Sequence, residues 1–251
     1  MPVVPRQPLD SHRRAIVVGA SSGIGAALAE AMAQRGYLVA AVARRADELA
    51  ALAARQAHIY PYAQDVTAFA ATEALFQRIV RDLDGLDVIV YAAGVQPSVG
   101  AQEYTFDKDQ AMVEVNLLGA MAWLNLAALR FSRARAGQIV GISSIAGDRG
   151  RAAFPGYHAS KAGLSTYLES LRNRLTRQGV TVTTIKPGFV ETRLLANASR
   201  TFWVISAETA AQHILRAIEQ RRQTVYVPGR WRWVSLIIQH LPSAILRRLN
   251  V

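Results

Sequence analysis

The sequence of 251 residues contains no cysteine and few acidic residues. Without a thiol, the chain cannot form a disulfide, use a cysteine nucleophile or hold a metal through thiolates, and we expect no metal site. Acidic side chains number 18 against 29 basic ones, which gives a formal net charge of +11. An excess of this size indicates an anionic partner, such as a nucleic acid, an anionic membrane surface or a ligand that carries phosphate.

Long hydrophobic runs are also missing. No segment reaches the roughly 18 to 20 uninterrupted apolar residues that a membrane-spanning helix requires. Residues 1–13 contain prolines and arginines and lack the apolar centre of a secretory signal. We therefore expect residues 1–13 to form a polar N-terminal arm and the protein to be cytoplasmic.

Short apolar runs alternate with helical patterns along residues 14–228. The strand-like runs are residues 15–18, 37–43, 58–62, 86–91, 138–142, 180–186 and 224–227. The helical patterns are residues 26–35, 47–56, 67–83, 107–131, 155–177 and 207–220. Strands that alternate with helices imply right-handed crossovers and a parallel sheet with both faces covered. The sequence therefore predicts one α/β domain, a Rossmann-type, doubly wound parallel seven-stranded sheet with helices on both faces.

A glycine-rich turn joins the first predicted strand to the first predicted helix. Its cofactor-binding candidates are Gly19, Ser21, Ser22, Gly23, Ile24 and Gly25. Glycine lets the backbone turn tightly and approach a pyrophosphate, and the helix that follows directs free N–H groups at it. Three glycines alone are equally typical of a flexible turn. Their position between the first strand and helix of an α/β sheet favours dinucleotide binding.

The second predicted strand ends in Arg44 and Arg45, without an acidic residue. NAD enzymes usually place Asp or Glu here for the ribose hydroxyls, whereas guanidinium groups match the 2′-phosphate of NADP. The pair can otherwise be ordinary solvated arginines at a helix start. Asp65 follows the third strand, where it can accept from the adenine amino group or cap the next helix. Val66 can pack on the adenine ring, and we assign all four residues to an NADP(H) site.

Tyr157 and Lys161 are four residues apart in a predicted helix, so they share one face. A free phenol has a pKa of about 10. A neighbouring ammonium and a positively charged oxidised nicotinamide both lower that pKa by favouring the phenolate, so that Tyr157 can exchange a proton with a carbonyl oxygen. An isolated pair of this kind is more typical of a helix surface. Ser144 follows the fifth strand, where a hydroxyl can donate to a developing oxyanion. Asn116 lies mid-helix between apolar neighbours, either as a satisfied buried amide or as part of a proton path through water.

Together these features resemble the short-chain dehydrogenase/reductase family over roughly residues 14–228. The matching elements, in chain order, are the glycine-rich turn, Asp65, Asn116, Ser144, Tyr157, Lys161 and the pair Pro187-Gly188. Ser144 rather than Ser143 matches the active serine, because it lies thirteen residues before Tyr157. The resemblance implies a catalytic tetrad in which an asparagine and a lysine organise a proton-relay water. Its members are Asn116, Ser144, Tyr157 and Lys161.

The resemblance also implies further contacts with the cofactor and an oligomeric state. The cofactor contacts come from Ala93, Gly94, Tyr157, Lys161, Pro187, Gly188, Val190 and Thr192. Val190 and Thr192 match positions that hold the nicotinamide carboxamide. Tyr91 and Ala92 stand where the family often has two asparagines that tie neighbouring strands, which puts the bonding at the centre of the sheet in question. The family implies a homodimer or homotetramer.

The sequence therefore predicts an NADP(H)-dependent oxidoreductase that interconverts a ketone or aldehyde with an alcohol by hydride transfer. Tyr157 is its general acid and base. The substrate-binding candidates are Ser144, Tyr157, Gln96, Phe154, Phe189 and Leu194, followed by Arg149, Leu195 and Trp203. They are mostly apolar, which suits a small hydrophobic or lipid-like carbonyl compound. The alternative is a catalytically inactive NADP(H) sensor or a membrane-surface binding protein on the same scaffold.

Residues 229–251 form an unusual basic and aromatic extension. Trp231 and Trp233 alternate there with Arg230 and Arg232, and Pro242 divides the segment into two short helices. Tryptophan with arginine on an amphipathic segment suits peripheral contact with an anionic membrane, which would make the protein membrane-associated. The other interpretation is a flap that packs over the active site or a partner subunit. Elsewhere the arginines are scattered without interleaved aromatic residues, so we expect no nucleic-acid partner.

Overall fold

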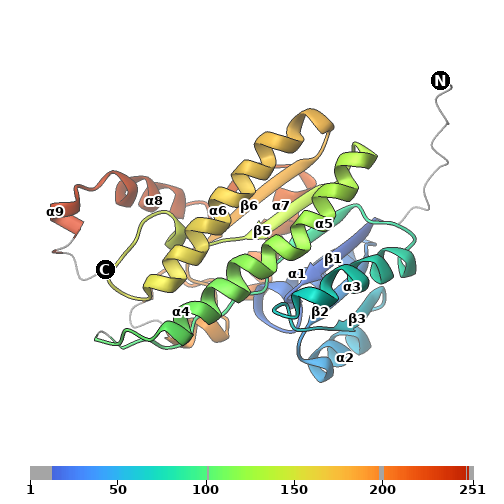
Figure 1. Cartoon of the computed structure of the whole chain (residues 1–251), viewed down its shortest axis with the longest axis horizontal. Helices are drawn as coiled ribbons and strands as arrows, with labels where there is room; N and C mark the ends of the chain where they lie inside the picture. The colour runs from blue at the N-terminus through green and yellow to red at the C-terminus, as the bar shows by residue number, and fades with distance from the viewer. Residues whose placement is uncertain (1–12, 101, 198–200, 247, 249–251) are drawn as a thin grey trace.

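Seven parallel strands form a single sheet in the computed structural model, which describes residues 13–100, 102–197, 201–246 and 248. The strands are β1 (Arg14–Val18), β2 (Leu38–Ala43), β3 (Ile59–Ala63), β4 (Val88–Tyr91), β5 (Gln138–Ile142), β6 (Thr181–Pro187) and β7 (Thr224–Val227). Their order is β3-β2-β1-β4-β5-β6-β7 (Figure 1). Because the strand order reverses between β1 and β4, a crevice forms at their carboxyl ends. The predicted Rossmann-type sheet is confirmed, whereas nearly all of the predicted N-terminal arm lies outside the described residues.

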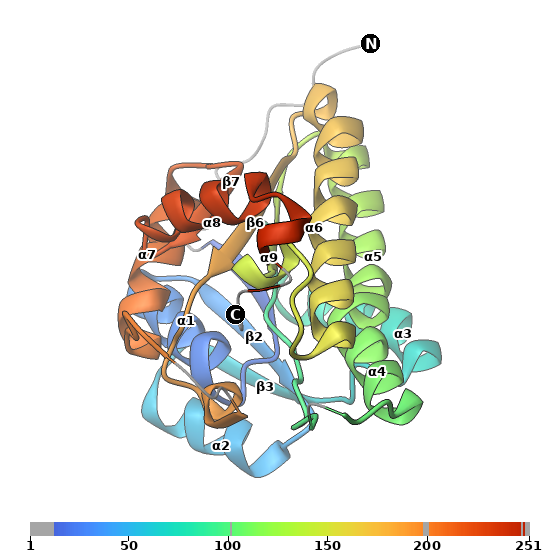
Figure 2. The same ribbon diagram turned by 90° about the vertical axis from the view of Figure 1, so that its left-hand side faces the viewer.

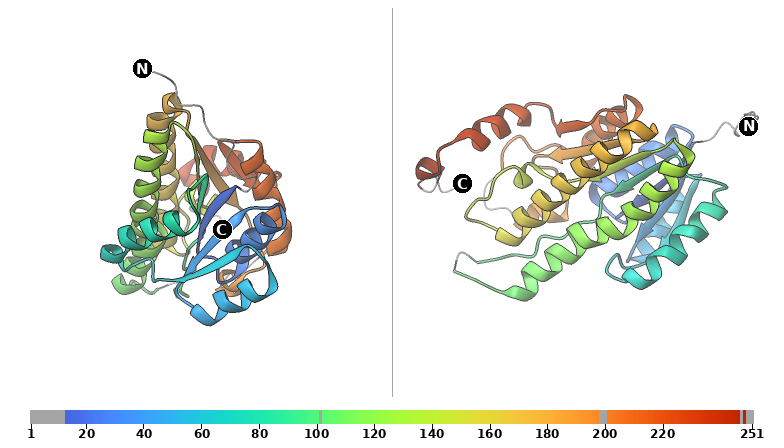
Figure 3. Two further views of the ribbon diagram at one scale, coloured as in Figure 1. Left: turned by 90° about the vertical axis from the view of Figure 1, so that its right-hand side faces the viewer. Right: turned by 45° about the horizontal axis from the view of Figure 1, so that its top comes forward.

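Helices cover both faces of the sheet, as Figure 2 and Figure 3 show. One face carries α1 (Gly23–Gln34), α2 (Ala46–Arg55) and α7 (Ala207–Glu219), and the other α3 (Phe69–Asp82), α5 (Gly119–Ala134) and α6 (Pro155–Leu175). α4 (Phe106–Val113) precedes α5, and α8 (Trp231–His240) and α9 (Ser243–Leu246) follow β7. Short 3-10 turns are η2 (Ile145–Gly147), η3 (Thr176–Gln178) and η4 (Arg193–Asn197). The two terminal helices are divided at Pro242, as the sequence predicts.

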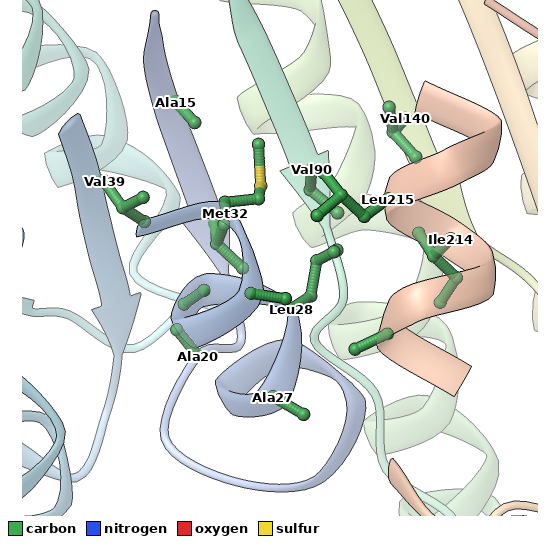
Figure 4. Packing of buried hydrophobic residues seen from close by; sticks show 14 of the residues in the cluster. Ala15, Ala20, Ala27, Leu28, Met32, Val39, Val90, Val140, Ile214 and Leu215 are labelled. Atoms are coloured by element: carbon green, nitrogen blue, oxygen red, sulfur yellow. The ribbon is translucent and has the colours of Figure 1, made fainter. Parts of the chain in front are cut away.

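Two hydrophobic clusters fill the space between the sheet and its helices. Figure 4 shows one of them, with Val90 and Val140 of the sheet beside Leu28 of α1 and Leu215 of α7. The second cluster contains the fully buried Trp123 of α5. Successive strand residues point to opposite faces, so strands covered on both sides must be apolar almost throughout. This requirement explains the nearly continuous apolar runs of β1, β2 and β4.

The helix predicted over residues 107–131 is interrupted by a π-helical segment. α4, the π-helical η1 (Glu114–Leu118) and α5 follow one another directly. The buried Tyr91, at the end of β4, donates its hydroxyl to the main-chain oxygen of Val115 at 2.6 Å. Main-chain bonding also joins the strand ends, because the nitrogen of Ala92 donates to the oxygen of Val18 at 2.7 Å. Tyr91 therefore joins β4 to η1. It does so at one of the two positions where the family often has an asparagine.

Among the described residues, the helical run Phe106–Ala134 is long and apolar enough to cross a membrane by length and composition. Its Trp123, Leu124 and Phe131 are buried in the cluster between the sheet, α3 and α6. The run is therefore a core helix of the domain.

Candidate active site

A cavity of about 900 Å³ opens at the carboxyl edge of the sheet. Its wall comes from the turn after β1, the ends of β2 and β3, the loops after β4, β5 and β6, and helices α6 and α8. All the predicted cofactor contacts line it, and so do Gln96, Phe154, Phe189 and Leu194. Asn116 lies fully buried behind this wall. The topology thus brings residues from most of the chain to one site.

The glycine-rich turn leaves space that a side chain would fill. Gly19 has a φ of +92°, and a Cβ there would lie 2.4 Å from the main-chain nitrogen of Ala93. A Cβ on Gly25 would lie 2.1 Å from the main-chain oxygen of Gly19. α1 begins at Gly23, and its N-cap residue Ser22 makes no side-chain capping bond. The helix N-terminus therefore stays available to an anion, and the turn fits a pyrophosphate.

The two arginines after β2 have different surroundings. Arg45 Nη2 donates to the hydroxyl oxygens of Ser21 and Ser22, both at 2.7 Å. Its Nη1 bonds Glu48 at 2.9 Å. Arg44 has a side chain 73% exposed, compared with 33% for Arg45. Arg45 is therefore the arginine that places a guanidinium beside the glycine-rich turn.

Asp65 caps the turn that precedes α3. Its Oδ1 accepts from the main-chain nitrogen of Thr67 at 3.0 Å and from the Thr67 hydroxyl at 2.8 Å. Its Oδ2 lies 3.5 Å from Arg44. These contacts, the Thr67 amide foremost, hold the pKa of the Asp65 carboxyl below its usual value. The capping interpretation is thus present in the structure, while Asp65 and Val66 also face the cavity.

Tyr157 and Lys161 lie one turn apart on α6 and line the cavity. Lys161 Nζ is 5.8 Å from the centre of the Tyr157 ring and donates to the main-chain oxygen of Ile142 at 3.0 Å. Burial lowers the pKa of Lys161 to about 8. Burial raises the pKa of Tyr157, although a hydrogen bond with Ser144 and the charge of Arg151 oppose it. The expected lowering of the Tyr157 pKa is therefore wrong for the protein without its cofactor. Desolvation of the phenolate outweighs the Ser144 hydrogen bond and the charge of Arg151.

The two serines after β5 face different ways. Ser143 Oγ donates to the main-chain oxygen of Lys161 at 2.9 Å and lies 2.7 Å from the Ser165 hydroxyl. Ser144 Oγ accepts from the nitrogen of Ala146 at 3.0 Å and reaches the Tyr157 hydroxyl. Ser143 thus joins β5 to α6, and Ser144 stands beside the tyrosine.

Asn116 is a satisfied amide within the π-helical segment. Its Oδ1 accepts from the nitrogen of Val95 at 2.8 Å. Its Nδ2 donates to the oxygen of Val95 at 3.1 Å and to the Ser160 hydroxyl at 3.0 Å. Of the two interpretations of this residue, the structure shows the buried amide, which holds the loop after β4 against α6.

The sequence matches the family model of the short chain dehydrogenases over residues 13–202. The chain belongs to the short-chain dehydrogenase family. An oxidoreductase of Myxococcus xanthus is 40% identical over 190 residues, which cover 74% of this chain and 75% of that protein. An oxidoreductase of Mycobacterium tuberculosis is 29% identical over 250 residues, which cover 95% and 97%. A solved short-chain dehydrogenase from Sphingobium yanoikuyae, in complex with NADPH, has a TM-score of 0.80 and 25% identity, covering 90% of this chain and 93% of that one.

Two predicted substrate contacts of this short-chain dehydrogenase lie outside the cavity wall. Arg149 donates to the main-chain oxygen of Gln239 at 2.8 Å and to the Ser243 hydroxyl at 3.1 Å. It therefore ties the loop after β5 to the terminal helices. Trp203 packs on Trp231, with ring centres 5.6 Å apart. Neither residue lines the cavity, although Trp203 packs against a residue of its wall.

Other wall residues of this dehydrogenase were not predicted as substrate contacts. Trp231, Val234 and Ile238 of α8 line the cavity at helical spacing. That spacing is visible in the sequence and favours the flap interpretation of the C-terminal segment. Arg151 and His158 also face the cavity, and no sequence motif marks them. Arg151 lies in the loop after β5 and His158 lies on α6 beside Tyr157, so the loop and the helix each bring one of them to the site.

Proposed function

We propose that this protein is an NADP(H)-dependent oxidoreductase that interconverts a hydrophobic ketone or aldehyde and its alcohol. The main support is that Tyr157, Ser144 and Lys161 line the same cavity as the glycine-rich turn. Arg45 lies beside this turn, at the end of a strand that is not followed by an acidic residue. Both features support NADP(H) over NAD(H) as the cofactor. The NADPH-bound Sphingobium relative supports the same choice.

The residues of the site divide the chemistry between them. When bound, NADPH supplies the hydride. Ser144 donates a hydrogen bond to the substrate carbonyl oxygen, and Tyr157 gives its proton to the same oxygen. The raised pKa of Tyr157 keeps the phenol protonated until that step. The charges of Lys161 and Arg151 then favour the phenolate that remains.

The substrate half of the cavity is apolar and aromatic. Its wall includes Phe189, Phe202, Trp231, Val234 and Ile238. The centre of the Trp231 ring lies 5.0 Å from that of Phe202 and 5.6 Å from that of Phe189. A wall of packed rings with few polar groups suits a hydrophobic carbonyl compound.

Replacing the phenol by a phenyl ring tests the proposal. Tyr157→Phe retains the packing but has no proton to give, so we expect kcat to fall by about 10²- to 10⁴-fold. The dissociation constant for NADPH, measured by fluorescence titration, should stay within about twofold of the wild type. Tyr167→Phe is the matched control, because Tyr167 lies on the same helix and bonds Asn125 at 2.8 Å outside the cavity.

The assay measures NADPH consumption with ketones that range from small to long-chain and lipid-linked compounds. Undiminished turnover by Tyr157→Phe would contradict the role of the tyrosine. A wild-type protein that binds NADPH but consumes it with no member of the panel would favour the inactive sensor instead.

A further inference from the structure

We propose that α8 docks this protein on an anionic lipid surface through the side that faces away from the cavity. The α8 outer face is defined by Trp233, Leu236 and Ile237, whose exposed fractions are 64%, 48% and 64%. These residues follow a spacing of three and four, so they share one side of the helix. Trp231 and Ser235 of the same helix are buried. One helix thus closes the cavity with one side and presents a large apolar surface with the other.

More exposed apolar residues flank this helix. Ile245 of α9 is exposed, and so are Phe202, Trp203 and Val204. Trp203 belongs to the aromatic cluster around Trp231, at the first residue of α8. Large apolar side chains gathered in this way mark an interaction surface more often than a solvated one.

Arginines flank the tryptophans at the α8 outer face. The guanidinium of Arg230 lies 4.8 Å from the ring centre of Trp203, and that of Arg232 lies 5.9 Å from the ring centre of Trp233. Residues 229–251 contain four arginines and no acidic residue. Tryptophan and arginine side by side match the boundary between lipid headgroups and acyl chains, where the rings enter and the guanidinium groups meet phosphate.

Two sets of contacts hold α8 against the body of the protein. The Asp148 carboxylate accepts from Lys186, from the Tyr226 hydroxyl at 3.1 Å and from the Ser235 hydroxyl of α8. Arg149 donates to the main-chain oxygen of Gln239 at the end of the same helix. These contacts fix the position of α8. Its outer face stays exposed, because no other described residue covers Trp233, Leu236 and Ile237 fully.

A second copy of the chain fits this face less well than a lipid surface does. Two-fold symmetry would bring the arginines of both copies into one interface with no acidic partner from residues 229–251. The segment around the start of α4 lies at the same end of the molecule (Figure 1) and exposes Tyr104 and Phe106. Asp107 and Asp109 follow there at once. This end of the molecule thus carries arginines beside α8 and acidic residues at the start of α4.

If the protein is a reductase of hydrophobic carbonyl compounds, docking would bring the cavity wall formed by α8 next to the membrane that dissolves such substrates. This consequence rests on the proposed function. Docking itself does not rest on the proposed function. It is measured as lipid binding, so its test is independent of catalytic turnover.

Vesicle co-sedimentation of the full chain with NADPH present tests the proposal. The vesicles are pure phosphatidylcholine or phosphatidylcholine with 30% phosphatidylglycerol. We expect the partition coefficient to be at least about tenfold higher on the anionic vesicles and to fall at high salt. Trp233→Ser with Ile237→Ser, and separately Arg230→Gln with Arg232→Gln, should each lower it about tenfold.

Matched controls change exposed residues of α5, which ends away from α8 in Figure 1. Leu129→Ser removes an apolar side chain that is 52% exposed, and Arg130→Gln with Arg133→Gln removes two charges. Both controls should bind like the wild type. Equal binding of the wild type to neutral and anionic vesicles, or equal losses in controls and α8 variants, would overturn the proposal. So would α8 variants that change the oligomeric state in light scattering without changing lipid binding.

Discussion

Arg44 and Arg45 are neighbours in the chain, but their contacts assign them different importance. Arg45 bonds two serines of the glycine-rich turn, whereas Arg44 is mostly exposed. A hydrogen-bonded charge contributes about 1.5–3 kcal/mol, so Arg45→Gln should lower kcat/KM for NADPH about 10- to 100-fold. The value for NADH should change by no more than about threefold, because NADH lacks the 2′-phosphate. Steady-state kinetics with both cofactors measures this.

Arg44→Gln is the matched variant for that experiment. We expect its loss with NADPH to be at least about fivefold smaller, since an exposed guanidinium gains less from a charged partner. Equal losses in the two variants, or a loss with NADH as large as that with NADPH, would contradict the assignment.

Lys161 makes the stability of the protein depend on pH. Burial lowers the pKa of Lys161 to about 8, so between pH 8 and the ordinary lysine value the folded chain binds fewer protons than the unfolded chain. Stability must rise with pH over that window. The free energy of unfolding of the wild type, minus that of Lys161→Met, should therefore increase by about 2 kcal/mol from pH 7 to pH 9.5. Urea unfolding at both pH values measures the difference. A difference that stays constant or decreases would show that Lys161 keeps its charge when buried.

At the level of secondary-structure elements, β4 and the π-helical segment are joined through Tyr91. A Cβ on Gly119, the first residue of α5, would lie 2.4 Å from the Tyr91 hydroxyl. Alanine usually stabilises a helix by about 1 kcal/mol relative to glycine. Gly119→Ala should instead lower the free energy of unfolding by about 1–3 kcal/mol, because the hydroxyl cannot move without leaving the oxygen of Val115.

A double-mutant cycle separates this clash from a general effect of glycine. Tyr91→Phe alone should cost about 1 kcal/mol. Combined with Gly119→Ala it should cost less than the sum by at least about 1 kcal/mol, since the clashing oxygen is gone. Gly150→Ala is the control, because a Cβ there meets nothing within 4 Å. Strict additivity would show that Tyr91 and Gly119 are not coupled.

For the whole molecule, protection from hydrogen exchange should follow the order of strands in the sheet and not their order in the chain. β1 and β4 lie at the centre, whereas β3 and β7 form the edges. Amides of β1, β4 and β5 should exchange only through global unfolding. Amides of β7 and α9 should exchange through local opening, with opening free energies about 2 kcal/mol or more below the free energy of global unfolding. Native-state exchange with mass spectrometry measures this. Equal protection of β7 and β1 would contradict the expectation.

Much of the architecture was predictable because the central strands are buried on both faces and most helices on one. That pattern is local, so strands such as residues 138–142 and 224–227 coincide with β5 and β7. The π-helical segment was not predicted, and the contact that Tyr91 makes with its Val115 joins residues 24 apart in the chain, beyond the reach of a local pattern. At the site, the glycine-rich turn and the Tyr157–Lys161 pair are short-range patterns and were found. Arg151 and His158 carry no such pattern and were missed.

The sequence alone establishes the type of sheet, the family and the side chains available for proton and phosphate chemistry, because periodicity and motif spacing are local properties of the chain. Long-range packing decides the rest. It makes Arg45 and not Arg44 the neighbour of the glycine-rich turn, raises the pKa of Tyr157 through burial, and turns Arg149 from a substrate contact into a support for α8. It also gives α8 one side toward the cavity and one toward solvent. Desolvation and hydrogen bonding depend on which distant residues meet, and only the folded chain brings them together.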